Sequence, residues 1–284
     1  MDTSWRQITI DFPDWDNAEH TALAHLAPRL ATAQTAETIG PWFFVRKAPG
    51  WRLRYQPPGD PAAAEDHLLH VLGPLQRDQH LTAVTPVIYE PETHAFGGTQ
   101  AMTAAHRLFH LDSHYLLAHL SCHRDRPHRR ELAILLCTAL LRAAGLDWYE
   151  QGDVWARVAD HRDPPELAPD GRLKTLHKGL RHLMSADIAQ LTRDGAPLAI
   201  PAAWPQAFAA AGRDLATLAA TGRLHRGLRA VMAHHLIFAF NRYGLPHQTQ
   251  SLLATGAKAV VFGPDPTTEE VEVVKDRPEH GAPA

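Results

Sequence analysis

Two arginines, Arg52 and Arg54, stand two positions apart in the stretch GWRLRY at residues 50–55. A strand has a side-chain period of two, so both arginines would lie on one face, with the apolar residues between them on the other. Guanidinium groups bind carboxylate or phosphate through paired hydrogen bonds, and two together make an anion clamp. A solvated strand face explains the same pattern. The spacing alone leaves both interpretations open.

A second group of reactive side chains lies in YEPETHAFGG, residues 89–98. Glu90 and Glu92 alternate out of a predicted strand, and His94 adds an imidazole, the side chain suited to proton transfer near neutral pH. The two glycines that follow allow backbone angles closed to other residues and close approach by a ligand. A plain strand-to-helix loop accounts for the same residues, and the spacing slightly favours it.

Histidines recur at every fourth position from His106 through His110 to His114. In one continuous helix they would form a stripe, and two histidines so spaced can bind zinc, as in a metal-dependent hydrolase. No carboxylate completes the helical His-Glu-x-x-His pattern, however. Asp112 and Ser113 have the side chains of a helix N-cap, which predicts a fresh helix there and a broken stripe. A metal site is therefore not expected.

The fourth group ends a predicted helix in LHRGLRAVMAHHLIFAFNRYGL, residues 224–245. Its apolar stripe is interrupted by His235 and is followed by Asn241 and Arg242. A histidine on an apolar face is more often a satisfied core residue than a catalyst. Three polar groups near one buried helix end are also typical of a binding site, and both interpretations stay open.

These side chains must be positioned by a small sheet in the first ~90 residues, where period-two and helical patterns alternate as β-α-β-β-α-β. This order is that of the split βαβ, or ferredoxin-like, arrangement. The predicted strands are 5–12, 42–48, 51–56 and 82–92, and the predicted helices are 16–33 and 61–77.

From Thr99 onward the pattern is helical. The predicted helices lie near 99–107, 111–121, 129–144, 149–161, 172–192, 204–220, 223–243 and 246–262. The sequence thus predicts an α+β fold, in which a split βαβ sheet layer (1–98) packs on a larger helical half (99–262) within a single domain. The polar, proline-bearing residues 263–284 are predicted to be a disordered tail.

Composition narrows the class of protein. The chain has 284 residues, a formal net charge of −3 and two cysteines. It has no overall basic field of the kind that nucleic-acid binding requires, and no disulfide framework. No signal pattern opens the chain, and no apolar run has membrane-spanning length. We therefore expect a cytoplasmic protein that binds neither nucleic acid nor membrane; the oligomeric state stays open.

The order of the motifs along the chain is more specific than any one motif. In chain order they are WFFVRKAPGWRLRY, YEPETHAFGG, AMTAAHRLFHLDS, GLDWYEQGDVWARV and HHLIFAFNRYGL. With these motifs the sequence resembles the thiopeptide-type bacteriocin biosynthesis family. That family is the stand-alone relative of the C-terminal elimination domain of lantibiotic dehydratases. The resemblance covers Trp5 to about Phe262.

The resemblance implies maturation of a ribosomally made peptide that carries a leader. One branch of the family removes glutamate from glutamylated Ser or Thr and leaves dehydroamino acids. A sister branch joins two dehydroalanines in a formal [4+2] cycloaddition, with loss of water and leader peptide, and leaves a pyridine-centred macrocycle. Neither branch implies a metal or an organic cofactor. The implied partners are the precursor peptide and other peptide-maturation enzymes, and the chain is not expected to bind tRNA directly.

The branches need different site chemistry, and this chain departs from the eliminases. It offers His94 where they carry an arginine before the Gly-Gly pair, and Ala239 and Phe240 precede Asn241 where they usually carry a histidine. We therefore favour the cyclase, with glutamate elimination as the alternative and leader docking without turnover as a third possibility. The expected catalytic residues are His94, His110, Asp112, Ser113 and His235, and the expected substrate-binding residues are Arg52, Arg54, Tyr89, Glu92, Asn241 and Arg242.

Overall fold

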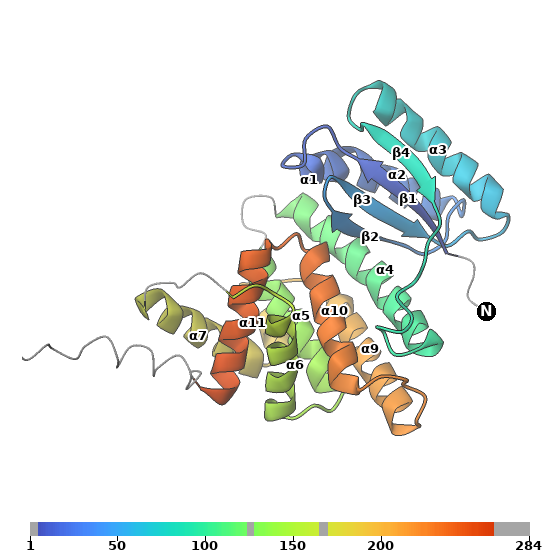
Figure 1. The fold of residues 1–284 in the computed structure, drawn as a ribbon. Helices are drawn as coiled ribbons and strands as arrows, with labels where there is room; N and C mark the ends of the chain where they lie inside the picture. The colour runs from blue at the N-terminus through green and yellow to red at the C-terminus, as the bar shows by residue number, and fades with distance from the viewer. Residues whose placement is uncertain (1–4, 124–127, 165–169, 264–284) are drawn as a thin grey trace, which may run out of the picture.

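The computed structural model describes residues 5–123, 128–164 and 170–263. Figure 1 shows a four-stranded sheet with helices on one face, a long helix α4 beneath it, and a cluster of further helices beyond α4. The predicted α+β fold is confirmed, with the sheet in the N-terminal part and a larger helical half after it. The predicted tail lies outside the described residues, apart from Gly263.

The sheet has the order β2-β3-β1-β4, and all three pairs of neighbours are antiparallel. Its strands are β1 (Arg6–Asp11), β2 (Trp42–Lys47), β3 (Gly50–Tyr55) and β4 (Ala83–Val87). With the intervening helices, this order gives the predicted split βαβ arrangement. The last strand is shorter than predicted, because its pairing with β1 ends at Val87, opposite Gln7.

The helices that connect β1 to β2 and β3 to β4 cover one face of the sheet (Figure 1). They are α1 (Ala18–Thr21), the π-helical turn η1 (Ala22–Leu26), α2 (Ala27–Thr35) and α3 (Pro61–Arg77). The α3 bounds match the prediction: the Asp60 carboxylate accepts a hydrogen bond from the Ala62 N–H at 3.1 Å, and Pro61 occupies the first turn. Trp51, Leu53 and Tyr55 all face this core.

Helix α4 (Thr99–Cys122) is continuous, so the predicted break at residues 112 and 113 is wrong. Asp112 and Ser113 are fully buried in mid-helix, and their side chains bond to other elements instead of capping a first turn. A cap forms only where the chain enters a helix, and tertiary contacts here override the local preference. One long helix therefore lies along β2 and joins the sheet to the helical half.

The helical half contains α5 to α11, and most bounds lie close to those predicted. They are α5 (Arg129–Ala143), α6 (Trp148–Asp160), α7 (Asp170–Ser185), α8 (Ile188–Thr192), α9 (Ala203–Ala220), α10 (Leu228–Arg242) and α11 (His247–Phe262). The predicted helix 172–192 is divided, because the Asp187 carboxylate accepts from the Ala189 N–H and caps α8. Within the described ranges no helix combines the length and apolar character that crossing a bilayer requires.

Candidate active site

The loop between β4 and α4 is fixed by its two glycines and by the segment before α10. Gly97 and Gly98 have φ of +88° and +111°, angles that favour glycine. The His225 backbone N–H donates to the Gly97 carbonyl at 2.8 Å, and Arg226 donates to the Ala95 carbonyl at 2.8 Å. Because residues 225 and 226 form hydrogen bonds to the loop, α10 begins at residue 228 and not at the predicted residue 223.

Arg54 lies on the sheet face opposite the N-terminal helices, and its side chain is buried. Its Nε donates to Gln7 Oε1 at 2.8 Å, and its guanidinium carbon lies 4.6 Å from the Tyr89 ring centroid and 5.5 Å from that of Phe43. Burial lowers the Arg54 pKa, and the nearby Tyr89 and Glu92 offset part of that effect. Arg54 is therefore an enclosed cation and not part of a solvated strand face, and its binding of an anion stays a prediction.

Tyr89 connects the arginine to a histidine on α4. Its hydroxyl lies 2.8 Å from Nε2 of His106. The His106 ring is buried and packs 4.5 Å from the Trp5 ring and 5.7 Å from Phe43. Sequence reasoning considered His106 only as a zinc ligand and did not connect it with Tyr89. The sequence feature that could have connected them is the Gly97-Gly98 pair, because a turn at these glycines brings Tyr89 and His106 back toward each other.

Glu92 and His234 are hydrogen-bonded between the loop and α10, with Oε2 and Nε2 3.0 Å apart. The hydrogen bond from His234 is the main influence lowering the Glu92 pKa, and the positive charges of Arg54 and Arg52 add to it. Arg52 and Arg54 of β3 and His234 in the first half of α10 thus all act on the Glu92 carboxylate. At the polar end of α10, Arg242 acts on Arg54 through its charge but makes its side-chain hydrogen bond elsewhere.

Asp112 and Arg242 instead form a buried ion pair between α4 and the end of α10. Arg242 Nε donates to Asp112 Oδ2 at 2.7 Å, and Asp112 Oδ1 accepts from Trp204 Nε1 at 2.8 Å and from the Tyr243 hydroxyl at 3.0 Å. The neighbouring Asn241 accepts from Gln250 on α11 at 3.1 Å. The Asp112 carboxylate therefore links α4, α9 and α10.

His110 and Ser113 lie along the outer edge of β2. The Phe44 N–H donates to Ser113 Oγ at 3.3 Å. His110 Nδ1 lies 3.2 Å from the Trp42 nitrogen and 2.9 Å from the Trp42 carbonyl oxygen. Burial lowers the His110 pKa. Side chains of α4 thus satisfy backbone groups of an edge strand that has no strand neighbour on that side in the part of the chain that the structure describes.

The last two predicted residues differ in exposure. His235 is 2% exposed and packs between Phe96 and Phe109, with ring centroids 4.9 and 5.9 Å away. Neither of its ring nitrogens has a hydrogen-bond partner among the described residues. Burial, with a smaller effect of neighbouring His234 and Arg242, lowers the His235 pKa to about 3. His94 is exposed on the loop.

The residues that assemble are thus Arg54, Tyr89, Glu92, His106 and His234. Of these five residues, Tyr89 lines a hollow of about 410 Å³, together with Trp5, which packs against His106. It is also lined by Arg6, Glu65, Pro86, Val87 and Ile88.

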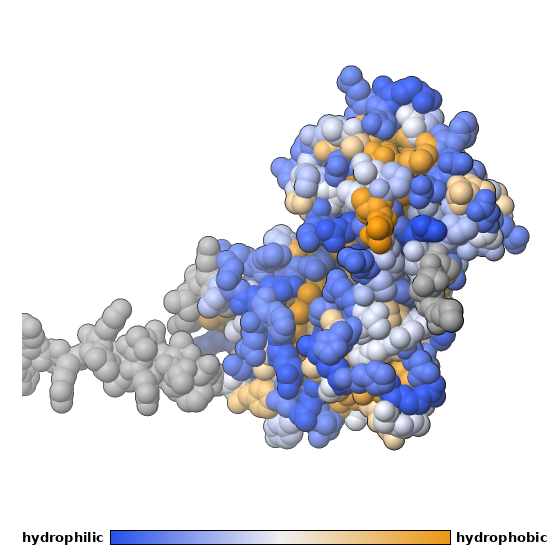
Figure 2. All heavy atoms as spheres, turned by 45° about the vertical axis from the view of Figure 1, so that its right-hand side comes forward, coloured by the Kyte–Doolittle hydropathy of each residue, from blue (hydrophilic) through white to orange (hydrophobic). Residues whose placement is uncertain are grey.

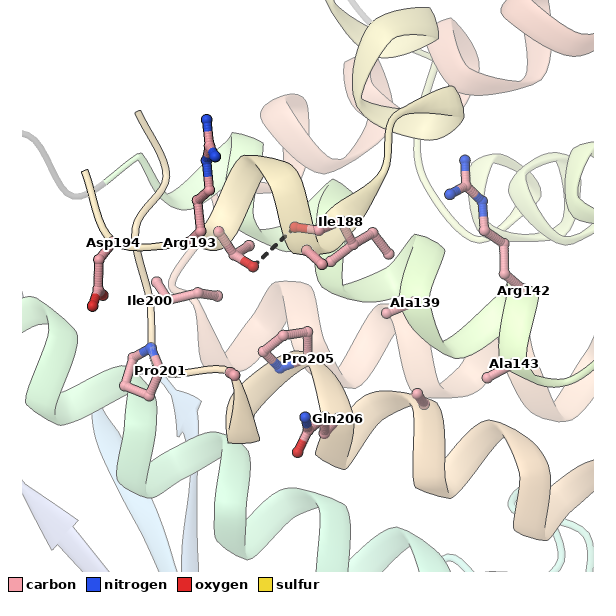
Figure 3. Close-up of a pocket in the computed structure, with 14 residues that line it drawn as sticks. Ala139, Arg142, Ala143, Ile188, Arg193, Asp194, Ile200, Pro201, Pro205 and Gln206 are labelled. Atoms are coloured by element: carbon pink, nitrogen blue, oxygen red, sulfur yellow. Dashed lines mark hydrogen bonds between the residues drawn. The ribbon is translucent and has the colours of Figure 1, made fainter. Parts of the chain in front are cut away.

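A cavity of about 820 Å³ lies elsewhere, between α5, α8 and α9 (Figure 3). Small and apolar side chains such as Ala139, Ile188 and Pro205 line it, and Arg142 and Arg193 extend away from them in Figure 3. The Arg142 guanidinium donates to backbone carbonyls at the end of α7. None of the residues predicted to be functional lines this cavity, so we do not count it as part of the candidate site.

The fold and the motifs together define a class of protein. Residues 5–261 match the family described as the lantibiotic biosynthesis dehydratase C-terminal domain, and the chain belongs to that family. The resemblance inferred from the motifs is thereby confirmed. No curated protein matches the chain in sequence.

Two solved structures have a similar fold. The tRNA-dependent lantibiotic dehydratase MibB from Microbispora sp. 107891 aligns with a TM-score of 0.62 and 19% identity, over 96% of this chain and 29% of MibB. TsrL aligns with a TM-score of 0.58 and 17% identity, over 92% of this chain and 99% of TsrL. The chain therefore spans less than a third of MibB but nearly all of TsrL.

Proposed function

We propose that this protein matures a ribosomally made thiopeptide-type precursor by a formal [4+2] cycloaddition of two dehydroalanines. Two alkenes are consumed as the ring closes, and water and the leader peptide, as its amide, then depart to leave a pyridine-centred macrocycle. The observation that carries this proposal is the Tyr89–His106 hydrogen bond beside the enclosed cation of Arg54.

The reaction needs a proton carrier more than a strong base. One amide must tautomerise before the ring closes, and a hydroxyl must be protonated before it leaves as water. Tyr89 can give a proton to the departing oxygen and regain one through His106, to which it is hydrogen-bonded. A hydroxyl and an imidazole that share a proton can both donate and accept, as the two steps require.

Holding the two alkenes together supplies the larger part of the rate, because positioning alone can be worth ~10⁵–10⁸ M in effective concentration. Trp5 packs on His106 and lines the hollow, where it provides apolar surface beside Tyr89. Flat azole rings of a modified precursor would stack on such surface. Arg54, with Arg52 on the same face, would hold peptide carbonyls or acidic leader residues.

The residues at the positions where an eliminase would carry its base also favour the cyclase. Ala239 and Phe240 are both buried, and neither side chain can accept a proton. His235 is the nearest buried imidazole toward the start of α10, and a pKa of about 3 makes it a weak base. We retain His94, exposed on the loop, as a second proton donor in the proposed reaction.

Glutamate elimination is the second candidate, and one observation favours it. The carboxylate of Glu92 lies in the field of both Arg52 and Arg54 and pairs with His234. A carboxylate of the protein therefore occupies the kind of place that a substrate glutamyl group would take. In this reaction the arginines would stabilise the departing glutamate, and His234 would remove the α-proton.

Mass spectrometry of the products separates these reactions. The protein is incubated with a dehydrated, azole-bearing precursor and, separately, with a glutamylated precursor. A macrocycle together with an intact leader amide supports the cyclase. Loss of glutamate from the second substrate, with no macrocycle from the first, overturns the cyclase in favour of elimination. Tight binding with no mass change in either substrate indicates a docking role and overturns both reactions.

A further inference from the structure

We propose that the outer edge of β4, with the hollow beside it, binds an extended segment of the precursor peptide and leads it to Tyr89. This inference rests on the proposed function, because it takes the substrate to be a peptide. It concerns a surface that none of the predicted site residues except Tyr89 touches.

The edge of β4 can pair with an extended chain. Strand β4 pairs with β1 on one side, and within the described ranges no strand pairs with its other side. The edge of a sheet presents backbone N–H and carbonyl groups that an added strand can satisfy. Peptides commonly bind in this way, with backbone hydrogen bonds giving affinity and pockets for alternate side chains giving specificity.

The end of β4 is unusually apolar for exposed surface. Val87 is 40% exposed and Ile88 is 88% exposed. Among the described residues only five large apolar side chains are exposed, and these two are the only ones adjacent in sequence. The sheet-bearing part in Figure 2 carries an apolar patch amid hydrophilic surface. Exposed apolar surface next to a cleft often marks a binding site.

The hollow continues from this edge to the candidate active site. Its volume of about 410 Å³ can hold a few peptide side chains, and its lining runs from Pro86 through Tyr89. Arg6 and Glu65 place opposite charges in the same hollow, so it can contact both the carbonyls and the N–H groups of a peptide. A chain that lies along Ile88 would next meet Tyr89, which contacts Arg54 and His106.

A peptide segment suits this edge better than a second copy of the protein. Pro86 has no N–H, and prolines in sheets occur where that missing group would face away from the neighbouring strand. The row of donors is therefore interrupted, which disfavours long pairing between two β4 strands. A short peptide needs only the groups around Ile88 and the adjoining hollow.

Peptide binding to matched variants tests the site. The probe is a fluorescein-labelled synthetic precursor peptide with its full leader, encoded in the same gene cluster, and anisotropy gives its Kd with the full-length protein. We expect Ile88→Lys to weaken binding at least tenfold. Tyr149→Lys changes an exposed apolar residue of α6 (66% exposed) that is not part of the hollow, and should leave Kd unchanged. Equal effects of the two variants, or no binding by the unaltered protein, would overturn the inference.

A nitroxide label separates a peptide from a second copy. Cys122 is exposed, so Ile88→Cys is made with Cys122→Ser and labelled at residue 88. Immobilisation of the label on addition of the peptide supports the proposal. Dipolar coupling between labels without peptide, which increases with protein concentration, shows a second copy on this edge and contradicts it. Binding is read without turnover, so a failed cyclisation leaves this result intact, and an unaffected Ile88→Lys leaves the proposed reaction intact.

Discussion

The hydroxyl of Tyr89 lies 2.8 Å from Nε2 of His106, although the two residues belong to different elements separated by the Gly97–Gly98 turn. The guanidinium carbon of Arg54 lies over the Tyr89 ring, 4.6 Å from its centroid. The Tyr89 phenol of the loop thus contacts both the Arg54 cation of β3 and the His106 imidazole of α4. In the proposed function this arrangement would hold a polar group of the peptide and exchange a proton with it.

Tyr89→Phe tests the proton carrier. The ring beneath Arg54 is retained, but the group that contacts His106 is removed. We expect kcat to fall by ~10²–10⁴-fold, the range typical of a lost general acid or base. Tyr149→Phe, which removes the hydroxyl of an exposed tyrosine, is the matched control. A Tyr89→Phe protein with normal kcat would remove Tyr89 from the chemistry.

Arg54→Lys tests the shape of the cation. Lysine keeps the positive charge but has no planar fork for paired hydrogen bonds, and it loses the bond from Nε to Gln7. We expect the KM for the precursor to rise at least tenfold, with only a modest change in the free energy of unfolding. Arg107→Lys on the exposed part of α4 is the control (side chain 64% exposed). Loss of stability in parallel with activity would indicate a structural role for Arg54.

The order of elements and the burial of β3 were predictable because period-two and helical patterns are local properties of the chain. Positions 112 and 113 show where such reasoning fails. Asp112 and Ser113 have the side chains of a helix cap, yet their partners, Arg242 and Phe44, are distant in sequence. A local pattern cannot reveal such partners. For the same reason the pairing of His106 with Tyr89 was missed, although each residue lay within a motif.

Asp112→Asn tests the buried ion pair with Arg242. The side chains of both residues are at most 1% exposed, so the substitution leaves a buried guanidinium without its counter-charge. Breaking such a pair typically costs about 3–5 kcal/mol in the free energy of unfolding. Asp214→Asn breaks the exposed pair with Arg107 and should cost about 0–1 kcal/mol. Urea denaturation of both variants checks the difference, and equal costs would contradict the structural role of Asp112.

His235→Leu tests the acid sensitivity of the fold. The His235 pKa is lowered from 6.5 to about 3, so between these values the unfolded chain binds a proton that the folded protein does not. This difference leaves the free energy of unfolding unchanged above pH 6.5. Below that value the free energy of unfolding decreases steadily as the pH falls toward 3. At about pH 5 the loss is on the order of 2 kcal/mol.

The leucine side chain of this variant cannot titrate, so the stability of the variant should fall less steeply with acid. Denaturation curves at pH 7 and pH 5 measure the change, and His247→Leu at an exposed histidine of α11 is the control. Parallel losses in the wild type and His235→Leu would show that this imidazole is not the acid-sensitive group.

Gly98→Ala tests whether the turn positions the site. Gly98 has φ of +111°, and an added Cβ would lie 2.9 Å from Nδ1 of His225. A residue with a side chain in this backbone region costs about 1–3 kcal/mol, and relief of that strain must move the loop that carries Tyr89. We expect lower stability together with a fall in kcat. Gly59→Ala, where an added Cβ would meet nothing within 4 Å, should be neutral in both measurements. A Gly98→Ala protein that loses stability but keeps full kcat would show that the turn supports the fold without orienting Tyr89.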